Sequence, residues 1–496
     1  MKKKILVLWG TEFTHFCISY HLQKKLDIDF YAIIDSPTSL NDFFEKQSLI
    51  NVTKKWYLHS HISKNFTIDE NFLPSIEKKY ELNLWKITLN ERLFYRFFDF
   101  YKFSRKEILS IEEQIIRLYE KILDDIKPDY LMIKLPHLHH QDLLIKICRK
   151  KGIKILMLNL SLIGPGSLLM QNSNKYDEIE NFDSTSFNMM SFEQCNSFLK
   201  GTKENMTRTA IKEKKINLKI LRIFFKFLFS NNNKINTNYD YYGRTKLKVI
   251  RYEINQLIKK FFRKKFIDQN LKMNVDLSTP FIYFPLNVDM ERAILMDAPY
   301  YTNHVETIRS VAKSIPINYL LYVKEHPAQI MRDWRQIREY KDILEIPNVI
   351  FLHPNFPTEK LYENCKAVIS IAGTSGFEAA VFKKPSIILT DLRYDFLPSI
   401  SKCKSLEYLP EIIQESILKN VNYEDVSKYF YFIKSIVCEF NWGKFNSDFN
   451  NEFYPDENFD VNIDENKLKV FLNKYESDLL PIVQAHIKKI NFFEKS

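Results

Sequence analysis

The sequence has 496 residues, of which 45% are hydrophobic and 27% charged, so it can bury large cores and should form about two or three domains. Only nine glycines occur, which excludes collagen-like and Gly-rich elastic chains, and the apolar content excludes wholesale disorder. The formal net charge is +11, but residues 201–266 hold 18 Lys and Arg against 4 Asp and Glu. The basicity therefore belongs to one segment, and the rest of the chain is slightly acidic.

Cysteine usage and hydropathy favour a cytoplasmic location. The six cysteines are far apart and form no C-x-x-C pair, which favours a reduced chain over a zinc knuckle or a redox motif. The basic start at residues 2–4 is followed by only five apolar residues, which is too short for the apolar core of a signal peptide. No segment approaches the roughly 20 apolar residues of a membrane span, so we expect at most peripheral membrane contact.

The first 200 residues alternate apolar runs with amphipathic stretches, a pattern typical of a parallel sheet with crossover helices. The predicted strands are Ile5–Trp9, Phe30–Ile34, Tyr130–Ile133 and Ile153–Asn159, and the predicted helices include Lys106–Asp125 and Gln141–Lys151. Residues 127–158 have the spacing of one compact βαβ unit. We therefore expect residues 1–200 to form a Rossmann-like domain.

Residues 201–275 form a predicted basic, amphipathic helical connector. Its segments 212–230 and 257–266 interleave Lys and Arg with Ile, Leu and Phe. Such helices lie on anionic membranes at about 1 kcal/mol per cation near the surface, but the same pattern fits a connector whose apolar face packs on its own domains. Both interpretations stay open. A nucleic-acid partner is not expected, because no recognisable nucleic-acid module accompanies the charge.

A second αβ pattern begins near Pro280. Its predicted strands are Phe281–Phe284, Tyr319–Val323, Val349–Leu352, Ala367–Ile371 and Ser386–Leu389, and its clearest predicted helix is Asn303–Ser314. We assign residues 276–425 to a second Rossmann-like domain and residues 426–496 to a tail, in which 446–465 should be a loop and Asn466–Tyr475 a closing helix. The predicted fold class is α/β, with two Rossmann-like domains that face each other.

Two turns of the second domain carry the strongest site signals. The run YVKEHP at residues 322–327 places Lys324 and His326 at the carboxyl end of a strand, where open α/β sheets bind ligands. The run GTSGFE at residues 373–378 follows another strand and opens a helix, so its N–H groups and hydroxyls form an anion site. A Walker loop and a G-x-G-x-x-G fingerprint are absent, which argues against a P-loop ATPase and a dinucleotide enzyme. The predicted binding residues are Lys324, Gly373, Thr374, Ser375, Gly376 and Glu378, although His326 also fits a buried structural histidine and Glu378 a helix cap.

These motifs resemble those of bacterial capsule and surface polysaccharide biosynthesis proteins, a family that includes CMP-Kdo-dependent transferases (Kdo is 3-deoxy-manno-octulosonic acid) of the two-domain glycosyltransferase B (GT-B) fold. The resemblance covers roughly residues 281–391 and rests on Pro285-Leu286, the predicted helix near 300–311, the KEHP and GTSGFEA runs and Lys384-Pro385. A His-Pro pair with a Ser/Thr turn is also similar to bacterial sialyltransferases. The resemblance therefore implies a CMP-activated donor more firmly than it implies one sugar.

The resemblance also implies roles for these residues. Lys324 would supply charge and His326 a hydrogen bond or proton to the leaving phosphate, while Thr374 and Ser375 would hold that phosphate. The same groups would replace a divalent metal, and no convincing D-x-D motif stands near them. We therefore expect a metal-independent glycosyltransferase without a bound cofactor, in which His326 is the catalytic residue of this domain.

The first domain is expected to supply the acceptor side and any catalytic carboxylate. Glu12, in the loop after the first predicted strand, is the first candidate and Asp142 the second. His137, in the run PHLHHQD at residues 136–142, is a candidate for substrate contact. The three histidines of that run also fit helix-start polarity, and a zinc site lacks further ligands at a known spacing.

The sequence thus predicts a transferase that moves Kdo or a related ulosonic acid from a CMP-activated donor to a capsule, lipopolysaccharide or other surface glycan acceptor. Residues 201–266 would hold the enzyme against the anionic inner face of the plasma membrane. Two alternatives remain. One is an isomerase like the UDP-sugar 2-epimerases, which share the fold, and the other is a catalytically inactive, membrane-associated assembly partner.

Overall fold

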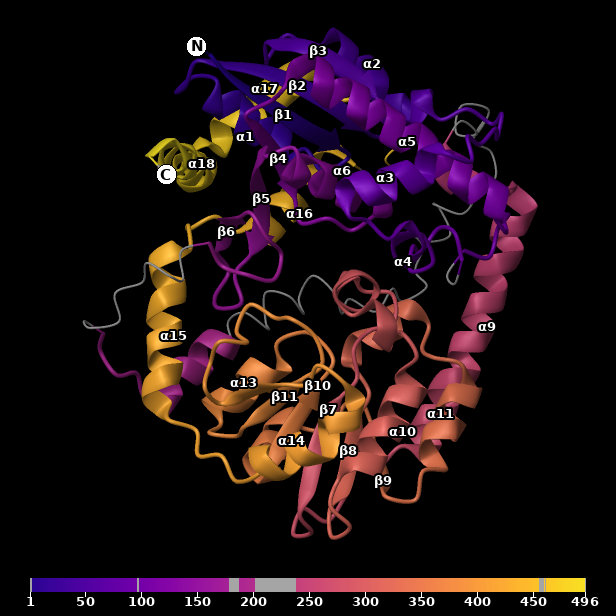
Figure 1. Ribbon diagram of the computed structural model, residues 1–496, viewed down its shortest axis with the longest axis vertical. Coiled ribbons are helices and arrows are strands. Elements are labelled where there is room, and N and C mark those ends of the chain that lie inside the picture. Colours follow the sequence, from indigo (N-terminus) through magenta and orange to yellow (C-terminus); the bar gives the residue numbers. More distant parts are fainter. Residues whose placement is uncertain are drawn as a thin grey trace.

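The computed structural model describes residues 2–95, 98–177, 187–200, 238–454, 459 and 461–495. Within them, two six-stranded sheets form the centres of two α/β domains, which lie one above the other in Figure 1. Helices α9 (Lys246–Asn270) and α15 (Tyr423–Ile436) run along opposite edges of the molecule (Figure 1). The predicted fold class, α/β with two Rossmann-like domains that face each other, is confirmed.

The sheet of the first domain has the strand order β3-β2-β1-β4-β5-β6. All its neighbouring strands are parallel except β5 and β6, which are antiparallel. Its strands are β1 (Lys3–Gly10), β2 (Ile28–Asp35), β3 (Val52–Tyr57), β4 (Tyr130–Lys134), β5 (Lys154–Leu160) and β6 (Ser167–Met170). Its helices are α1 (Thr14–Leu22), α2 (Thr38–Lys46), α3 (Phe72–Tyr80), α4 (Leu84–Thr88), α5 (Arg105–Ile126) and α6 (His139–Lys150). The predicted βαβ unit is β4–α6–β5.

Strand β1 shows why the first sheet is covered on both faces. Alternate side chains of a strand point to opposite faces, and Ile5 and Val7 enter one hydrophobic cluster while Leu6 and Leu8 enter another. All four are buried. A strand buried on both faces needs a continuous apolar run, which is the pattern that made β1 recognisable in the sequence.

The sheet of the second domain is fully parallel, with the order β12-β11-β10-β7-β8-β9. Its strands are β7 (Phe281–Pro285), β8 (Leu320–Lys324), β9 (Val349–Leu352), β10 (Ala367–Ser370), β11 (Ser386–Ile388) and β12 (Ile400–Lys402). Its helices are α10 (His304–Ser314), α11 (Ile337–Leu344), α12 (Thr358–Asn364), α13 (Ser375–Val381) and α14 (Leu409–Ser416). Because β7 lies between β8 and β10, the carboxyl ends of these three strands are neighbours.

The C-terminal helices return to the first domain. They are α16 (Trp442–Phe453), α17 (Glu465–Lys474) and α18 (Glu476–Lys495), and they share one hydrophobic cluster with α1 and β1. The predicted closing helix is α17, but the loop predicted over 446–465 is wrong for its first part, where α16 continues to Phe453. The physical reason is that Phe445, Phe449 and Phe453 recur every four residues and are all buried in that cluster.

The predicted basic connector is only partly within the described residues. Residues 201–237, including the predicted run 212–230, lie outside them, whereas the run 257–266 belongs to α9. Helix α9 buries only Ile267 fully and exposes several large apolar side chains. No described helix is both long and apolar enough to cross a membrane.

Candidate functional site

The carboxyl ends of β7, β8 and β10 bring the two predicted turns together. Strand β8 leads into Lys324 and His326, and β10 leads into Gly373 and Thr374. Between them, Asn287 follows β7 and donates a hydrogen bond from Nδ2 to the carbonyl of Ala372 at 2.9 Å. The sheet order thus explains how two motifs that lie 47 residues apart in the sequence meet at one edge.

A buried network of charged side chains contacts the turn that follows β8 through Glu325. The Arg335 guanidinium donates from Nε to Glu325 Oε2 at 2.8 Å and also pairs with Asp289, which lies 3.1 Å from His304 Nδ1. Tyr340 donates a further hydrogen bond to Glu325 Oε2 at 2.9 Å. One guanidinium therefore bridges two buried carboxyl groups, and burial raises the pKa of one of them, Glu325, to about 8.

The Gly373-Thr374 turn has a backbone conformation that favours glycine and is supported by side chains. Gly373 has a φ of +95°, and its carbonyl accepts a hydrogen bond from the Tyr394 hydroxyl at 2.7 Å. Thr374 Oγ1 donates to Glu378 Oε1 at 2.8 Å, and the Tyr362 hydroxyl donates to Glu378 Oε2 at 3.0 Å. The Glu378 carboxylate therefore accepts hydrogen bonds from two side-chain hydroxyls, and its proposed roles as a helix cap or a ligand contact stay predictions.

His326 is a neutral imidazole in this setting. Burial and the nearby Lys324 ammonium lower the pKa of His326 to about 4, against the opposing influence of Glu378. Its Nδ1 accepts a hydrogen bond from the Ala328 N–H at 3.1 Å, so the ring proton is on Nε2. Lys324 itself is only 5% exposed. This group can therefore offer a hydrogen-bond donor and a shielded positive charge at the turn.

A cavity of about 400 Å³ lies between the two domains. The second domain contributes Gly373 and Thr374, and the first contributes His137. Four arginines also line it: Arg92, Arg292, Arg332 and Arg393. Arg393 joins the domains directly, because its Nη1 donates to the Leu160 carbonyl at the end of β5 at 2.8 Å. Such a wall favours an anionic ligand.

The sequence did not identify these arginines or the carboxylates beside them. Asp297 is held by Arg292, with 2.9 Å from Nη2 to Oδ1, whereas Glu291 forms no ion pair with a described residue. Partial burial raises the pKa of Glu291, although Arg332 acts in the opposite direction. Glu291 and Arg292 sit in the loop after β7, so their position past a strand end was the one available signal.

Glu12 lies at a different cavity, of about 270 Å³, at the carboxyl edge of the first sheet. Its Oε1 is 3.0 Å from Lys134 Nζ, and its buried Oε2 has no hydrogen-bond partner within the part of the chain that the structure describes. Tyr454 covers this loop by donating from its hydroxyl to the Thr11 carbonyl at 2.8 Å. The structure does not bring Glu12 to the interdomain cavity, and its catalytic role stays a prediction.

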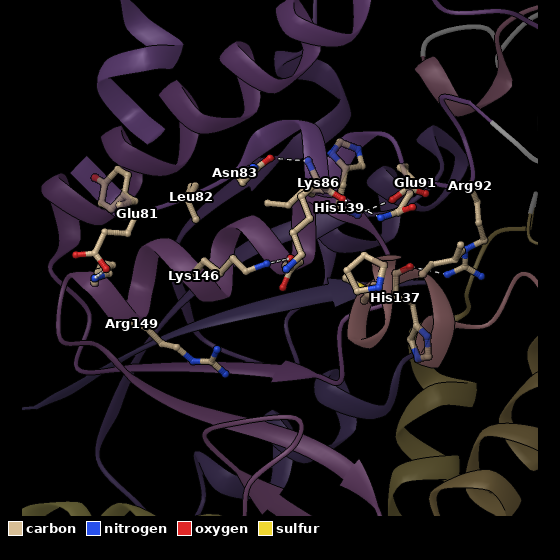
Figure 2. A pocket seen from close by; sticks show the side chains of 18 residues that line it. Glu81, Leu82, Asn83, Lys86, Glu91, Arg92, His137, His139, Lys146 and Arg149 are labelled. Atoms are coloured by element: carbon tan, nitrogen blue, oxygen red, sulfur yellow. Dashed lines mark hydrogen bonds and ion pairs between the residues drawn. The ribbon is translucent and has the colours of Figure 1, made fainter. Parts of the chain in front are cut away.

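Asp142 and His137 line a further cavity, of about 340 Å³, which Figure 2 shows. Asp142 is paired with Lys146 one helical turn later, so its carboxylate is already engaged. His137 lies on both this cavity and the interdomain one, and burial together with Lys134, Arg292 and Arg92 lowers its pKa to about 3. Of the predicted site residues, His137, Gly373 and Thr374 thus share the interdomain cavity.

The other two histidines of the run at residues 136–142, His139 and His140, form hydrogen bonds or ion pairs with buried side chains of the first domain. His139 Nδ1 is 2.7 Å from Glu112 Oε1, and its Nε2 is 2.9 Å from the Tyr239 hydroxyl. His140 Nε2 is 2.8 Å from Asp35 Oδ2. Among the described residues, no group of three or more His, Cys, Asp or Glu has the arrangement of a metal site.

Comparison with known proteins gives one family match. Residues 140–402, more than half of the chain, match the family model described as capsule polysaccharide biosynthesis protein. No curated protein matches the sequence.

Solved structures resemble the chain only loosely. The UDP-GlcNAc 2-epimerase from Methanocaldococcus jannaschii, in complex with UDP-GlcNAc and UDP, is 14% identical, with 88% of this chain and 100% of that chain covered and a TM-score of 0.25. KpsC, the beta Kdo 2,7 transferase of Thermosulfurimonas dismutans, is 10% identical over 66% of this chain and 80% of that chain, with a TM-score of 0.27. The E. coli ADP-heptose lps heptosyltransferase II is 9% identical over 84% of this chain and 98% of that chain, with a TM-score of 0.22. At these TM-scores the neighbours carry no argument about activity.

Proposed function

Because the chain belongs to the capsule polysaccharide biosynthesis family, we propose that it is a glycosyltransferase that moves a sugar from a CMP-activated donor to a surface glycan. The donor sugar is Kdo or a related ulosonic acid, and the acceptor is a capsule, lipopolysaccharide or similar chain. The observation that carries the proposal is the interdomain cavity, where the Gly373-Thr374 turn meets four arginines.

Charge at the cavity suits a donor that releases a nucleoside monophosphate. Breaking the bond between the anomeric carbon and the phosphate leaves negative charge on the phosphate oxygens as the sugar approaches an oxocarbenium state. The backbone N–H groups of the Gly373-Thr374 turn would donate hydrogen bonds to those oxygens. His326 and Lys324 do not line the cavity, so the neutral His326 Nε2–H would donate to the phosphate, and Lys324 would add positive potential, only if the donor extends towards the β8 turn. In this proposal these groups and the arginines do the work of a metal, so transfer needs no cofactor.

The acceptor hydroxyl must lose a proton when it attacks. Glu291 lines the same cavity, is not ion-paired with a described residue, and has a pKa raised by partial burial, so it suits a general base better than the engaged Asp297. Glu12 and Asp142, the carboxylates chosen from the sequence, would reach the reaction only if the cavities that they line join the interdomain one.

Calorimetry on the full-length protein tests the donor class. CMP, CDP, UDP and GDP are titrated into the wild type, into His326→Ala, and into His61→Ala as a control for an exposed histidine outside the site. We expect CMP to bind best, His326→Ala to weaken it about tenfold or more, and both His61→Ala and added EDTA to leave it unchanged. A preference for UDP would favour the isomerase, and the absence of all nucleotide binding would favour the inactive assembly partner.

Helix α9 also supports contact with an anionic membrane surface. Its exposed apolar side chains fall within an arc of about 140° at 100° per residue, and they are Leu247, Ile254, Leu257, Ile258, Phe261 and Phe262. Exposed cations lie on or beside that arc, among them Lys248, Arg251, Lys259 and Lys265. The opposite side of the helix packs on the second domain, where Arg263 donates to the carbonyl of Asp333 at 2.8 Å.

Vesicle flotation tests this part of the proposal. The wild type should float with vesicles that contain phosphatidylglycerol and not with pure phosphatidylcholine, and high salt should reduce the effect. The double variant Phe261→Ser/Phe262→Ser should float less, whereas Phe492→Ser, at an exposed phenylalanine of α18, should behave as wild type. Equal flotation on both lipids would contradict a preference for an anionic surface, and no flotation on either would contradict membrane docking. A dimer through α9 would appear instead as a doubled mass in solution.

A further inference from the structure

The cavity in Figure 2 is a second polar site, beside the interdomain one. It has a volume of about 340 Å³, within the range of small-molecule sites. Its walls come from the end of α3, from α4 and from α6, and the second domain adds Leu295, Met296 and Pro299. Arg92 and His137 line both cavities, so a ligand in one lies next to a ligand in the other.

More cations line this cavity than form ion pairs with described carboxylates. Two of its five cations are paired, Lys146 with Asp142 and Lys150 with Glu81. The other three are Lys86, Arg92 and Arg149, and none forms an ion pair with a described carboxylate. Among the described residues, Arg92 and Arg149 donate to the neutral carbonyls of His137 and Gln171, and Lys86 Nζ lies 5.3 Å from the ring centre of Tyr300.

A buried acceptor atom lies in the same wall. Glu91 is 6% exposed, and its Oε2 accepts a hydrogen bond from the His139 N–H at 2.7 Å. Its Oε1 has no hydrogen-bond partner among the described residues. A buried carboxylate oxygen without a donor is costly, and a rotation of this side chain, which lines the cavity, would let a ligand hydroxyl satisfy it. The wall thus matches a ligand that carries both hydroxyls and an anionic group.

We propose that this cavity binds an acidic sugar unit of the acceptor glycan, with its carboxylate or phosphate at Lys86 and Arg149 and a hydroxyl at Glu91. The inference rests on the proposed function, because only a transferase needs an acceptor. The shared wall of Arg92 and His137 places the next part of the acceptor at the interdomain cavity, where the donor would lie. Acceptor choice then depends on charge, because a neutral sugar leaves the three cations unmatched.

Titration followed by ligand-observed NMR tests this site on the full-length protein. The probes are glucuronate, glucose 1-phosphate and glucose, which separate a carboxylate from a phosphate and both from a neutral sugar. We expect one or both acids to bind and glucose to bind at least about tenfold more weakly. Equal binding of glucose, or no binding of either acid, would overturn the proposal.

Variants locate the binding. Lys86→Gln/Arg149→Gln removes two exposed cations, so the fold should persist, and the affinity for the acids should fall about tenfold or more. Lys25→Gln, at an exposed lysine at the opposite edge of the first sheet, is the matched control and should bind as wild type. Unchanged affinity of the double variant, or an equal loss in the control, would show that the acids bind elsewhere.

CMP affinity of the same variants separates this inference from the proposed function. Lys86 and Arg149 do not line the interdomain cavity, so CMP should bind to the double variant as to the wild type. Binding of the acids without any binding of CMP would contradict the proposed CMP-activated donor and still support a site for acidic sugars. Binding of CMP without binding of the acids would contradict only the proposal that this cavity binds the acceptor.

Discussion

The carboxyl edges of the two sheets are both held by buried ionic groups, but the cations differ. At the second sheet, the Arg335 guanidinium contacts the carboxyl groups of both Glu325 and Asp289. At the first sheet, histidines do this work, since His140 and His59 hold the pKa of Asp35 well below its usual value although burial opposes ionisation. An arginine stays protonated at any physiological pH, whereas a histidine titrates near neutrality. The cation of the second edge therefore keeps its charge, although burial raises the pKa of the Glu325 carboxyl beside it to about 8. At the first edge burial acts in the opposite direction, but Asp35 raises the pKa of His59.

The largest effect should come from removing the Arg335 guanidinium. Arg335→Met leaves Glu325 and Asp289 buried without their cation, which should cost about 3–5 kcal/mol of the free energy of unfolding. Urea denaturation at pH 7 measures the loss. The matched control is Lys46→Met, because Lys46 and Asp42 form an exposed pair that should contribute less than about 1 kcal/mol. A loss below about 1 kcal/mol for Arg335→Met would mean that the network is not a support.

A smaller effect is expected when one glycine from each domain is replaced by alanine and the two variants are compared. Gly373 and Gly152 have φ of +95° and +77°, so alanine at either position is strained and should cost about 1–2 kcal/mol in stability. A Cβ on Gly373 would also lie 3.4 Å from Asn287 Nδ2, whereas a Cβ on Gly152 meets nothing within 4 Å. CMP affinity, measured by calorimetry, should therefore fall in Gly373→Ala and stay unchanged in Gly152→Ala. Equal CMP affinity in both variants would contradict the role of the turn.

Much of the fold was predictable because its signals are local. The buried strands are continuous apolar runs, and the parallel order follows from helices placed between them. The KEHP and GTSGFE runs were recognisable for the same reason, since their residues are consecutive. The strands β3, β6 and β12 were missed. All three are edge strands; β3 and β12 interrupt their apolar residues with polar ones, and β6 is an apolar run of only three residues after Ser167.

The site as a whole was less predictable because it is assembled from distant loops. Arg92, Arg292, Arg332 and Arg393 belong to separate segments of two domains, and a single arginine in a loop has no periodicity or motif. Glu12 was chosen for its place after a strand, but that placement does not say which cavity the side chain lines. Only the packing of the two domains decides which strand-end residues share a cavity.

The smallest effect is expected in the pH dependence of CMP affinity, which tests the protonation state of His326. With a pKa lowered to about 4, the imidazole is neutral at pH 5.5 and at pH 7.5, and it binds through Nε2–H at both. The ratio of CMP affinities between wild type and His326→Ala should therefore stay constant over this range. The phosphate of CMP changes its own ionisation near pH 6, but that change is the same for both proteins and cancels in the ratio. Thr374→Ala, which removes no titratable group, gives the baseline. A ratio that grew about threefold or more towards pH 5.5 would mean that His326 titrates near its usual pKa and binds as a cation, so that burial and Lys324 do not control it.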